Sequence, residues 1–489
     1  MPSRRQFIQA VALAGAASRG GPSLSAGHSA VISPEMKSLS QYMTEASSQL
    51  LPREVIEQAK FHIIDTLAAM VSGSQLAPGV AALSYVKTRA GQGSLGLRTV
   101  IGSSMQASAI EAALVNGVMA HSDETDDSHN RSRTHPGCAV VPAALAAGQE
   151  FAIDGTQFLR AVTLGYDIGT RVVMAMGGPK FSYESHKSSH AIGGVFGAAA
   201  AAASTAQLSA QQMRWVLDYT CQQSSGIAVW RRDTDHIEKA FTFAGMPASN
   251  GVRSALLVQN GWTGVDDVFS GVDNFFDAYA PAADKTKLVE QLGQRFEITQ
   301  TDIKKWTVGS PVQGPLDAMQ NIMSKQAFSA DQVKSVVVRL GPDAAAVVDN
   351  REIPDICLQY LAAVMLLDKT VSFKAAHDVA RMKDPKILEA RRKINLIKDD
   401  ALTSFLPVRV AIVEVELSDG QRWVERVDAV RGTPRNPMTK AEVIDKCADL
   451  MQHVLGKQKT HQLIDTIFSI EQVSDLRSLG SMLRTGASR

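Results

Sequence analysis

The sequence predicts a mainly α protein, in which a large all-helical domain carries an inserted, smaller α+β lid domain. Three observations lead to this prediction. From residue 34 to about residue 275, apolar residues recur at helical spacing among many alanines, and no segment is a convincing strand. After about residue 276, valine-rich segments alternate as half-buried strands do. A last helical segment then returns the chain to the first domain.

The first part of the helical domain is assigned to residues 31–275. Pro52 suits the first turn of a helix, and Gly73 is expected to end that helix as a C-terminal cap. Helical patterning continues in later segments. The last of these contains six consecutive alanines, which would let neighbouring helices approach closely. The segments are 105–120, 142–149 and 196–206.

The lid domain is assigned to residues 276–432. Residues 333–340 are predicted to form a strand that stops at Gly341-Pro342. Residues 406–417 and 421–427 are predicted to form a β-hairpin around a Ser-Asp-Gly turn. Helical segments between the strands are expected at 311–327 and 354–367.

The chain is expected to return to the helical domain in residues 433–489. A proline-rich linker at 433–437 precedes a helix at 439–455. A chain of 489 residues exceeds one ordinary core, which agrees with two domains. Clefts between domains are preferred sites for ligands.

Composition excludes several classes of protein. The formal net charge is +1 and no long basic run occurs, so nucleic acid is not expected as a partner. No apolar stretch reaches the roughly 18 residues that a membrane span needs, so membrane anchoring is not expected. The four cysteines are scattered without a C-x-x-C pair, which excludes an ordinary zinc ribbon and gives no disulfide framework.

Residues 1–30 are typical of a targeting segment rather than of a fold. Arg4-Arg5 is followed by Phe7, Ile8 and a short, weakly apolar run, and then by a Gly/Ser-rich stretch. This order predicts a twin-arginine (Tat) export signal and a periplasmic protein. The alternative is a disordered basic start on a cytoplasmic protein.

The densest chemistry lies in residues 121–135. Four carboxylates and three imidazoles fall in this stretch, which stands between two apolar, alanine-containing segments; they are Asp123, Glu124, Asp126, Asp127, His121, His129 and His135. Such a cluster can serve acid/base chemistry, bind a metal, or hydrogen-bond a buried turn. The spacing matches no standard metal site, because H-E-x-x-H is absent and an EF-hand would need a central glycine and a final glutamate. No metal is therefore expected in this stretch.

Three further stretches carry candidate binding groups. Residues 185–197 combine histidines with a Gly-Gly-x-x-Gly pattern at a helix start, where exposed N–H groups favour an anion. Residues 236–251 carry Lys239 in a loop that opens into another helix. Residues 303–317 carry Lys304, Trp306 and Gln313. In each case the simpler alternative is helix packing or a solvated lysine.

Taken in order, these stretches resemble the MmgE/PrpD family of dehydratases, decarboxylases and epimerases. The resemblance runs from Pro34 onward and includes the Leu-Pro-Arg-Glu-Val segment at 51–55, the acidic run with Thr-His-Pro, and the glycine-to-polyalanine helix. It also includes the Asn250-Gly251 helix start and the Asn436-Pro437 return. The resemblance implies a helical domain with an inserted α+β lid, a homodimer, and activity on di- or tricarboxylates without metal or nucleotide.

The resemblance also implies catalytic residues. The family's acidic run usually reads Asp-aromatic-Asp-Asp-Thr-His, so Glu124 stands for an aspartate, Asp127 is retained, and Ser128 stands for a threonine. His135 matches the family's Thr-His-Pro histidine without a shift. Strict spacing places the second family histidine at Ser188, between His186 and His190, and we assign it to His190 with His186 as the alternative.

The implied substrate-binding residues are Lys239, Lys304 and Gln313. Lys239 matches a family lysine off by one residue, and Lys304 matches the lid lysine. Thr307 and Gln313 replace a proline and a histidine that many members carry, which suggests a substrate other than methylcitrate or cis-aconitate. We expect a lyase acting on a small di- or tricarboxylate, by dehydration through an enolate-like intermediate. Decarboxylation, epimerisation, a metal-dependent hydrolase or lyase, and a non-catalytic carboxylate-binding protein remain alternatives.

Overall fold

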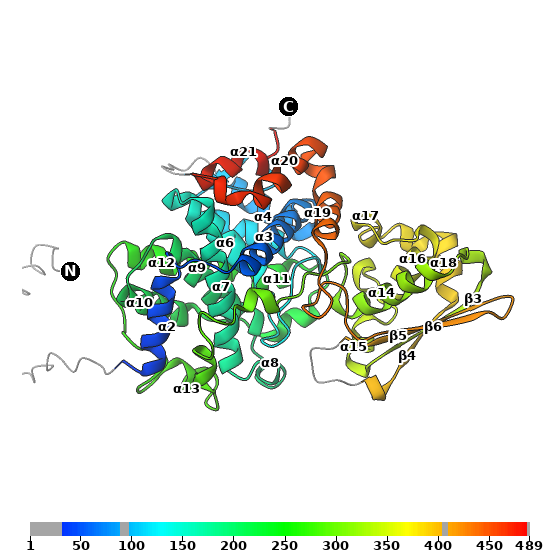
Figure 1. Ribbon diagram of the computed structural model, residues 1–489, viewed down its shortest axis with the longest axis horizontal. Coiled ribbons are helices and arrows are strands. Elements are labelled where there is room, and N and C mark those ends of the chain that lie inside the picture. The colour runs from blue at the N-terminus through cyan, green and yellow to red at the C-terminus, as the bar shows by residue number, and fades with distance from the viewer. Residues whose placement is uncertain (1–31, 89–96, 403–408, 487–489) are drawn as a thin grey trace, which may run out of the picture.

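The computed structural model describes residues 32–88, 97–402 and 409–486. The predicted export signal therefore lies outside the described residues. The described chain is mainly helical with small sheets, which confirms the prediction of a mainly α fold. Its buried apolar residues form two clusters, one in a helical region and one in an α+β region that spans Trp306 to Val430. Figure 1 shows the sheet of the α+β region at one end of the molecule, away from most of the helices.

The helical region is built around α9 (Ser189–Thr205), which is buried along its whole length. It packs on α7, α12 and α6, and small residues allow the close approach. A Cβ on Gly169 of α7 would lie 2.3 Å from the main-chain oxygen of Gly193 of α9. The N-terminal helices are α2 (Pro34–Glu45), α3 (Arg53–Gly73), α4 (Ala77–Lys87), α5 (Ala109–Ala120), α6 (Gly137–Phe151), α7 (Gly155–Ala175), α8 (Pro179–Glu184), α10 (Ala210–Gln223), α11 (Ile237–Ala240), α12 (Met246–Gln259) and α13 (Phe275–Tyr279).

Two local predictions for this region were wrong. Gly73 does not cap α3 in a left-handed conformation; it is the last residue of the helix. Its missing side chain serves packing instead, because a Cβ there would lie 2.0 Å from the main-chain oxygen of Met119 on α5. The region also holds a two-residue antiparallel ladder of β1 (Arg98–Thr99) and β2 (Gln106–Ala107), too short to leave an alternating pattern.

The α+β region contains a four-stranded sheet in the order β4-β3-β5-β6. Strand β3 (Val333–Leu340) has the predicted bounds, and β5 (Ala411–Leu417) pairs with β6 (Arg422–Val427) as the predicted hairpin, with Gly420 at φ +89 in its turn. Strand β4 (Ile394–Lys398), which the sequence did not predict, pairs in parallel with β3. The helices are α14 (Ser310–Lys325), α15 (Pro342–Val348), α16 (Leu358–Asp368), α17 (Phe373–Ala376) and α18 (Pro385–Arg392).

The C-terminal segment packs on the helical core through α19 (Lys440–Leu455), α20 (Lys457–Phe468) and α21 (Gly480–Leu483). Helix α19 starts with a capping box of Thr439 and Glu442 and lies against α3, as Figure 1 shows. Lys446 of α19 lies 2.6 Å from Asp65 of α3 and donates to the main-chain oxygen of Thr125 at 3.1 Å. Through Lys446, the C-terminal segment thus holds the main chain of the acidic run in place.

Residues 276–303 also contribute to the helical core, although the sequence-based division assigned them to the lid. Phe276, Leu288, Phe296 and Ile298 are buried in that core. Within the described ranges, no single helix is long and apolar enough to cross a membrane; α3 and α4 meet the length and composition test only as a pair, bent by 79°.

Candidate active site

The acidic run forms a buried connection between α5 and α6. Helix α5 is capped at its start by Ser108 and ends before His121, and α6 begins at Gly137. His121, Asp126 and His129 of this connection are completely buried. Buried charged groups are costly unless they are paired or hydrogen-bonded, so the partners of each group indicate what it does.

Asp127 anchors the run to the start of α6. Its carboxylate accepts hydrogen bonds from the Gly137 N–H at 3.0 Å and from the Tyr166 hydroxyl at 2.5 Å, and it lies 2.9 Å from Nδ1 of His62. Gly137 has no room for a side chain, because a Cβ would lie 2.8 Å from Asp127 Oδ2. The structure therefore gives Asp127, predicted as a catalytic residue, a set of partners that suits a structural anchor.

Asp126 is the carboxylate at the centre of the cluster. Its Oδ2 lies 2.8 Å from Nδ1 of His121 and 3.2 Å from Nδ1 of His135, and its Oδ1 lies 3.6 Å from Nζ of Lys304. Burial alone would raise the pKa of Asp126, but these three neighbours hold the pKa well below its usual range. Asp126 is therefore an anion that can orient His135.

Glu124 lies between the two predicted substrate-binding lysines. Its carboxylate pairs with Lys239 of α11, and Lys304 Nζ lies 3.9 Å from the other carboxylate oxygen. Lys304 also donates to the main-chain oxygen of Glu124 at 2.7 Å. Burial opposes ionisation of Glu124, but both lysines hold its pKa well below the usual range. The structure thus brings Glu124, Lys239 and Lys304 together.

The two predicted histidines also meet at this cluster. The ring centroids of His135 and His190 are 5.1 Å apart, and His190 stacks on Phe243 with centroids 3.9 Å apart. Burial lowers the pKa of both, that of His190 well below its usual range. His186, the alternative to His190, is exposed. At neutral pH, His135 is therefore a neutral imidazole beside an ionised carboxylate.

Ser128 and Gln313, the remaining predicted site residues, form their hydrogen bonds outside this cluster. The backbone of Ser128 pairs with Asp302, and its hydroxyl lies 3.5 Å from the Arg409 guanidinium. The Gln313 amide is completely buried and binds the loop before α14, accepting from Trp306 N and donating to the main-chain oxygens of Trp306 and Val308. Gln313 thus shapes the loop that carries Lys304, rather than offering a free amide to a ligand.

Sequence reasoning missed two residues that the α+β region brings to the acidic run. His377, at the end of α17, places Nε2 at 3.0 Å from Asp123 Oδ2 and Nδ1 at 2.8 Å from the main-chain oxygen of Phe373. Burial opposes the charged form of His377, but Asp123 outweighs it and raises the pKa to about 9. Asp355 is a buried carboxyl just before α16. Neither lies in a motif, so the sequence offered no signal for them.

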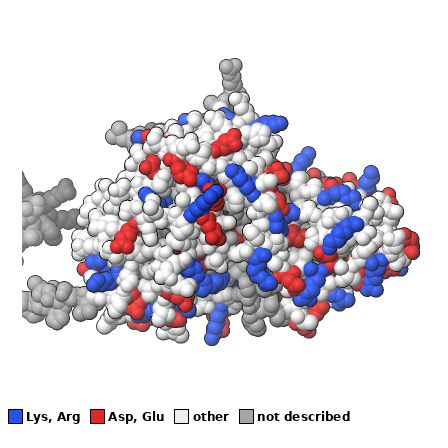
Figure 2. Space-filling view, viewed as in Figure 1, with Lys and Arg blue, Asp and Glu red and all other residues white. Residues whose placement is uncertain are grey.

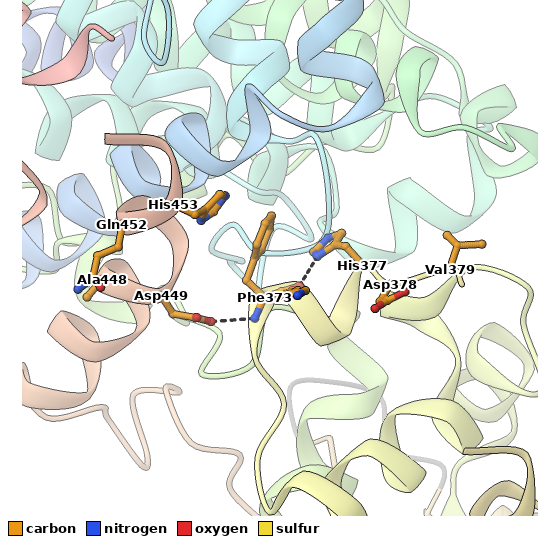
Figure 3. A pocket seen from close by; sticks show the side chains of 9 residues that line it. Phe373, His377, Asp378, Val379, Ala448, Asp449, Gln452 and His453 are labelled. Atoms are coloured by element: carbon orange, nitrogen blue, oxygen red, sulfur yellow. Dashed lines mark hydrogen bonds between the residues drawn. The ribbon is translucent and has the colours of Figure 1, made fainter. Parts of the chain in front are cut away.

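An open cleft of about 580 Å³ lies where α17 meets α19. Figure 3 shows Phe373 and His377 facing Asp449 and His453 across it. The Phe373 N–H donates to Asp449 at 2.7 Å, and the Phe373 and His453 rings stack with centroids 5.4 Å apart. Because His377 lines this cleft and contacts Asp123, the cleft reaches one edge of the acidic run.

Three side chains of the cluster could hold a metal ion by distance alone. One donor atom each of His121, Asp126 and Cys138 lies within 4.8 Å of the others. Burial, with Asp126 and Asp127 nearby, raises the pKa of the Cys138 thiol well above its usual range, so the protonated thiol is a poor ligand. His121 Nδ1 and Asp126 are already hydrogen-bonded to each other. The donor set fits a hydrogen-bonded cluster better than a metal site.

On the face of the molecule in Figure 2, no patch of one charge sign stands out. Lysine and arginine side chains are interspersed there with aspartate and glutamate over both regions. On this face, no patch of one charge sign matches the buried acidic run in density.

Comparison with known proteins identifies the family. The MmgE/PrpD N-terminal domain matches residues 37–287, and the MmgE/PrpD C-terminal domain matches residues 306–470. The chain is 22% identical over 467 residues to a cis-aconitate decarboxylase of Aspergillus terreus, covering 88% of this chain and 92% of that protein. It is also 22% identical over 482 residues to the cis-aconitate decarboxylase-like protein oryM of Aspergillus oryzae, covering 91% and 96%. The resemblance inferred from the sequence is confirmed, and the chain belongs to the MmgE/PrpD family.

Proposed function

We propose that this protein is a lyase that acts on a small di- or tricarboxylate through an enolate-like intermediate, with loss of water as the reaction. One observation carries the proposal: Lys239 and Lys304, from segments far apart in the chain, converge on Glu124 beside the neutral imidazole of His135. Two ammonium groups next to a neutral base form the charge pattern that removal of a proton α to a carboxylate requires.

The lysines supply the binding of carboxylates. In the absence of substrate, Lys239 is paired directly with Glu124, and Lys304 lies near both Glu124 and Asp126. A substrate carboxylate would share or replace that pairing, and the same charges would then stabilise the negative charge that develops on the enolate. Glu124 thus acts as an internal counter-ion for a site that is built to hold anions.

His135 supplies the base. Its lowered pKa leaves it neutral near pH 7, as a proton acceptor must be, and Asp126 would stabilise the imidazolium formed by proton transfer. His121 and Lys304 keep Asp126 ionised for this task. The stacked rings of His190 and Phe243 lie next to His135.

Decarboxylation is the second candidate, and the names of the relatives favour it. The Aspergillus terreus relative is a cis-aconitate decarboxylase, and this chain covers 92% of its length. Loss of carbon dioxide would use the same lysines and the same enolate-like intermediate, but it needs an acid in place of the base.

A panel screen by NMR tests the proposal. Purified protein is incubated with hydroxylated acids (malate, citrate, 2-methylcitrate) and unsaturated acids (fumarate, cis-aconitate), and products are read from the proton spectrum. Formation of an alkene from a hydroxy acid supports dehydration. Carbon dioxide release from an unsaturated acid supports the second candidate, and no turnover of any polycarboxylate contradicts the proposal.

A further inference from the structure

Phe243 lies at the centre of a group of stacked rings beside the acidic run. Its ring stacks on His190 with centroids 3.9 Å apart and an angle of 11°, and on His121 with centroids 4.6 Å apart and an angle of 15°. Two imidazoles have no room side by side on one face of a phenyl ring at these distances, so Phe243 is sandwiched between them. Trp230 stands perpendicular to the Phe243 ring, with centroids 4.6 Å apart. The Phe243 side chain is 1% exposed.

His135 adjoins the same group of rings. Its centroid lies 5.2 Å from that of His121, 5.1 Å from that of His190 and 5.8 Å from that of Phe243. His121 and His135 also share one carboxylate oxygen, because Asp126 Oδ2 lies 2.8 Å from Nδ1 of His121 and 3.2 Å from Nδ1 of His135. A rotation of either stacked imidazole would therefore change the surroundings of His135.

Hydrogen bonds do not fix the planes of the two stacked imidazoles. Among the residues that the structure describes, Nδ1 of His190 and Nε2 of His121 have no hydrogen-bond partner. His121 is held through Nδ1, by Asp126, and one hydrogen bond leaves a ring free to turn about it. Stacked aromatic rings, by contrast, prefer defined geometries. Stacking on Phe243 is therefore the contact that sets both planes.

The backbone that carries Phe243 is a π-helical turn, Phe241–Gly245, between α11 and α12. Such turns are rare and occur frequently at functional sites. This turn packs closely on α5, because a Cβ on Gly117 would lie 2.8 Å from the main-chain oxygen of Ala244. Lys239 precedes the turn, and its Nζ lies 5.3 Å from the centre of the Phe243 ring. The turn thus fixes Phe243 against the helix that leads into the acidic run.

We propose that Phe243 is a positioning residue, which sets the ring planes of His121 and His190 and, through them, the place of His135. For its effect on catalysis this inference rests on the proposed function, in which His135 is the base. Phe243 acts only through the imidazoles that it contacts. Its apolar ring also excludes water from them, and burial is the main cause of the lowered pKa of His135 and of His190.

The charged groups around the imidazoles act in both directions. His135 faces Asp126, which favours its charged form, and Lys304 and His121, which disfavour that form. The principal groups that face His190 all disfavour its charged form; they are His135, Arg133, His121 and Lys239. Water in place of the phenyl ring would leave these charges where they are and reduce the cost of burial. The pKa of both imidazoles should therefore rise when the phenyl ring is removed.

The test compares Phe243→Leu with Phe269→Leu. Leucine keeps an apolar side chain but has no flat face on which an imidazole can stack. Phe269 is also 1% exposed, and among the described residues its ring contacts three phenylalanine rings and no histidine ring. Both replacements should lower the melting temperature by similar amounts, because each removes a buried phenyl ring.

The first readout is the titration of His135 and His190, followed by NMR of protein with isotope-labelled histidine and assigned with His135→Gln and His190→Gln. In the wild type, both pKa values should lie below the usual range. In Phe243→Leu both should be higher, and in Phe269→Leu both should match the wild type. This readout needs no substrate, so it is independent of the reaction.

The second readout is steady-state kinetics with the substrate found in the panel screen. For Phe243→Leu, kcat should fall by ~10–100-fold, the cost of misplacing a catalytic group by about 1 Å. KM should change little, because Lys239 and Lys304 keep their place beside Glu124. The pH below which kcat/KM falls should rise, because His135 accepts a proton only when neutral. Phe269→Leu should show wild-type kcat and an unshifted profile.

Three results would overturn the inference. They are unchanged titrations in Phe243→Leu, shifted titrations with a wild-type kcat, and equal effects in Phe243→Leu and Phe269→Leu, which would assign Phe243 to core packing. If Phe243→Leu does not fold, the wild type decides, because stacking on Phe243 should shift the ring protons of His190 upfield and unshifted protons would contradict the arrangement. A wild type that turns over no polycarboxylate contradicts the proposed function, whereas the titrations still report whether Phe243 positions the imidazoles.

Discussion

Nδ1 of His135 lies 3.2 Å from Oδ2 of Asp126, a carboxylate that solvent does not reach. Both residues belong to the connection between α5 and α6, so the geometry of the pair depends on the contacts that fix this connection. Asp127 fixes one end at the start of α6, and Lys304 and Lys446 bind main-chain oxygens along it. These contacts hold the connection, so His135 and Asp126 already lie side by side before any substrate binds.

Lys239→Met should weaken substrate binding while the fold is retained. Lys239 is partly exposed and forms an ion pair with Glu124. Hydrogen bonds to charged groups are worth about 1.5–3 kcal/mol, so KM should rise by ~10–100-fold. Lys304→Met should raise KM and also lower the melting temperature, because Asp126 and Glu124 lose a buried partner. Steady-state kinetics and calorimetry check both. Lys305→Met is the neighbouring control, and equal effects at all three positions would count against the assignment.

His377 should make the stability of the protein depend on alkaline pH. Its pKa is raised from 6.5 to about 9, so its contribution is fully present below pH 6.5 and is lost as pH rises through about 9. A shift of this size corresponds to on the order of 3 kcal/mol. His377 faces Asp123, Asp355 and the main-chain oxygen of Phe373.

The measurement is the free energy of unfolding of wild type and His377→Gln from pH 6 to pH 10. The difference between them should shrink above pH 8 and vanish near pH 10. The exposed His461→Gln serves as control. A difference that stays constant over this range would contradict the pairing of His377 with Asp123.

Activity should survive exhaustive chelation. His121, Asp126 and Cys138 come close enough to hold an ion, but the Cys138 thiol is held protonated, and His121 and Asp126 are paired with each other. The check is turnover after dialysis against a chelator, together with metal analysis of wild type and Cys138→Ala. Loss of activity that one particular metal restores, with less of that metal in the variant, would show that a metal is required.

We propose that residues 1–30 direct export by the twin-arginine route. Because the receptor reads the arginine pair and not its charge, Arg4→Lys with Arg5→Lys should retain the protein in the cytoplasm at full length. Cell fractionation of wild type should find a shortened protein in the periplasm. Wild type in the cytoplasm with residues 1–30 attached would instead support a disordered basic start.

Local patterns predicted the larger elements well and the smaller ones poorly. The bounds of β3 followed from its valine-rich pattern, and the pairing of β5 with β6 followed from alternating valines and a Ser-Asp-Gly turn, although β5 begins at Ala411 and not at the predicted residue 406. Strand β4 was missed because only Ile394 of its five residues is buried, so this edge strand lacks a regular apolar pattern. Gly73 was assigned to a cap because the close approach of α5 is a tertiary contact, which no local pattern records.

In the candidate site too, residues in local motifs could be predicted from the sequence, and residues brought in by tertiary packing could not. His135, Glu124, Lys239 and Lys304 were predicted because they occur in motifs, and the fold brings them together. Gln313 was assigned to the substrate by its position in a motif, whereas its amide is occupied by the loop of Trp306 and Val308. Asp355 and His377 reach the acidic run only through the packing of the α+β region, and a single sequence contains no record of that packing.

The most direct test of the account is the reaction of His135→Ala. In this variant, turnover of the substrate found in the panel screen should fall by ~10²–10⁴-fold and α-proton exchange in D2O should disappear, while the melting temperature changes little. The exposed His461→Ala should behave as wild type in all three measurements. Near-normal turnover and exchange in His135→Ala would remove His135 from the chemistry and contradict the central claim.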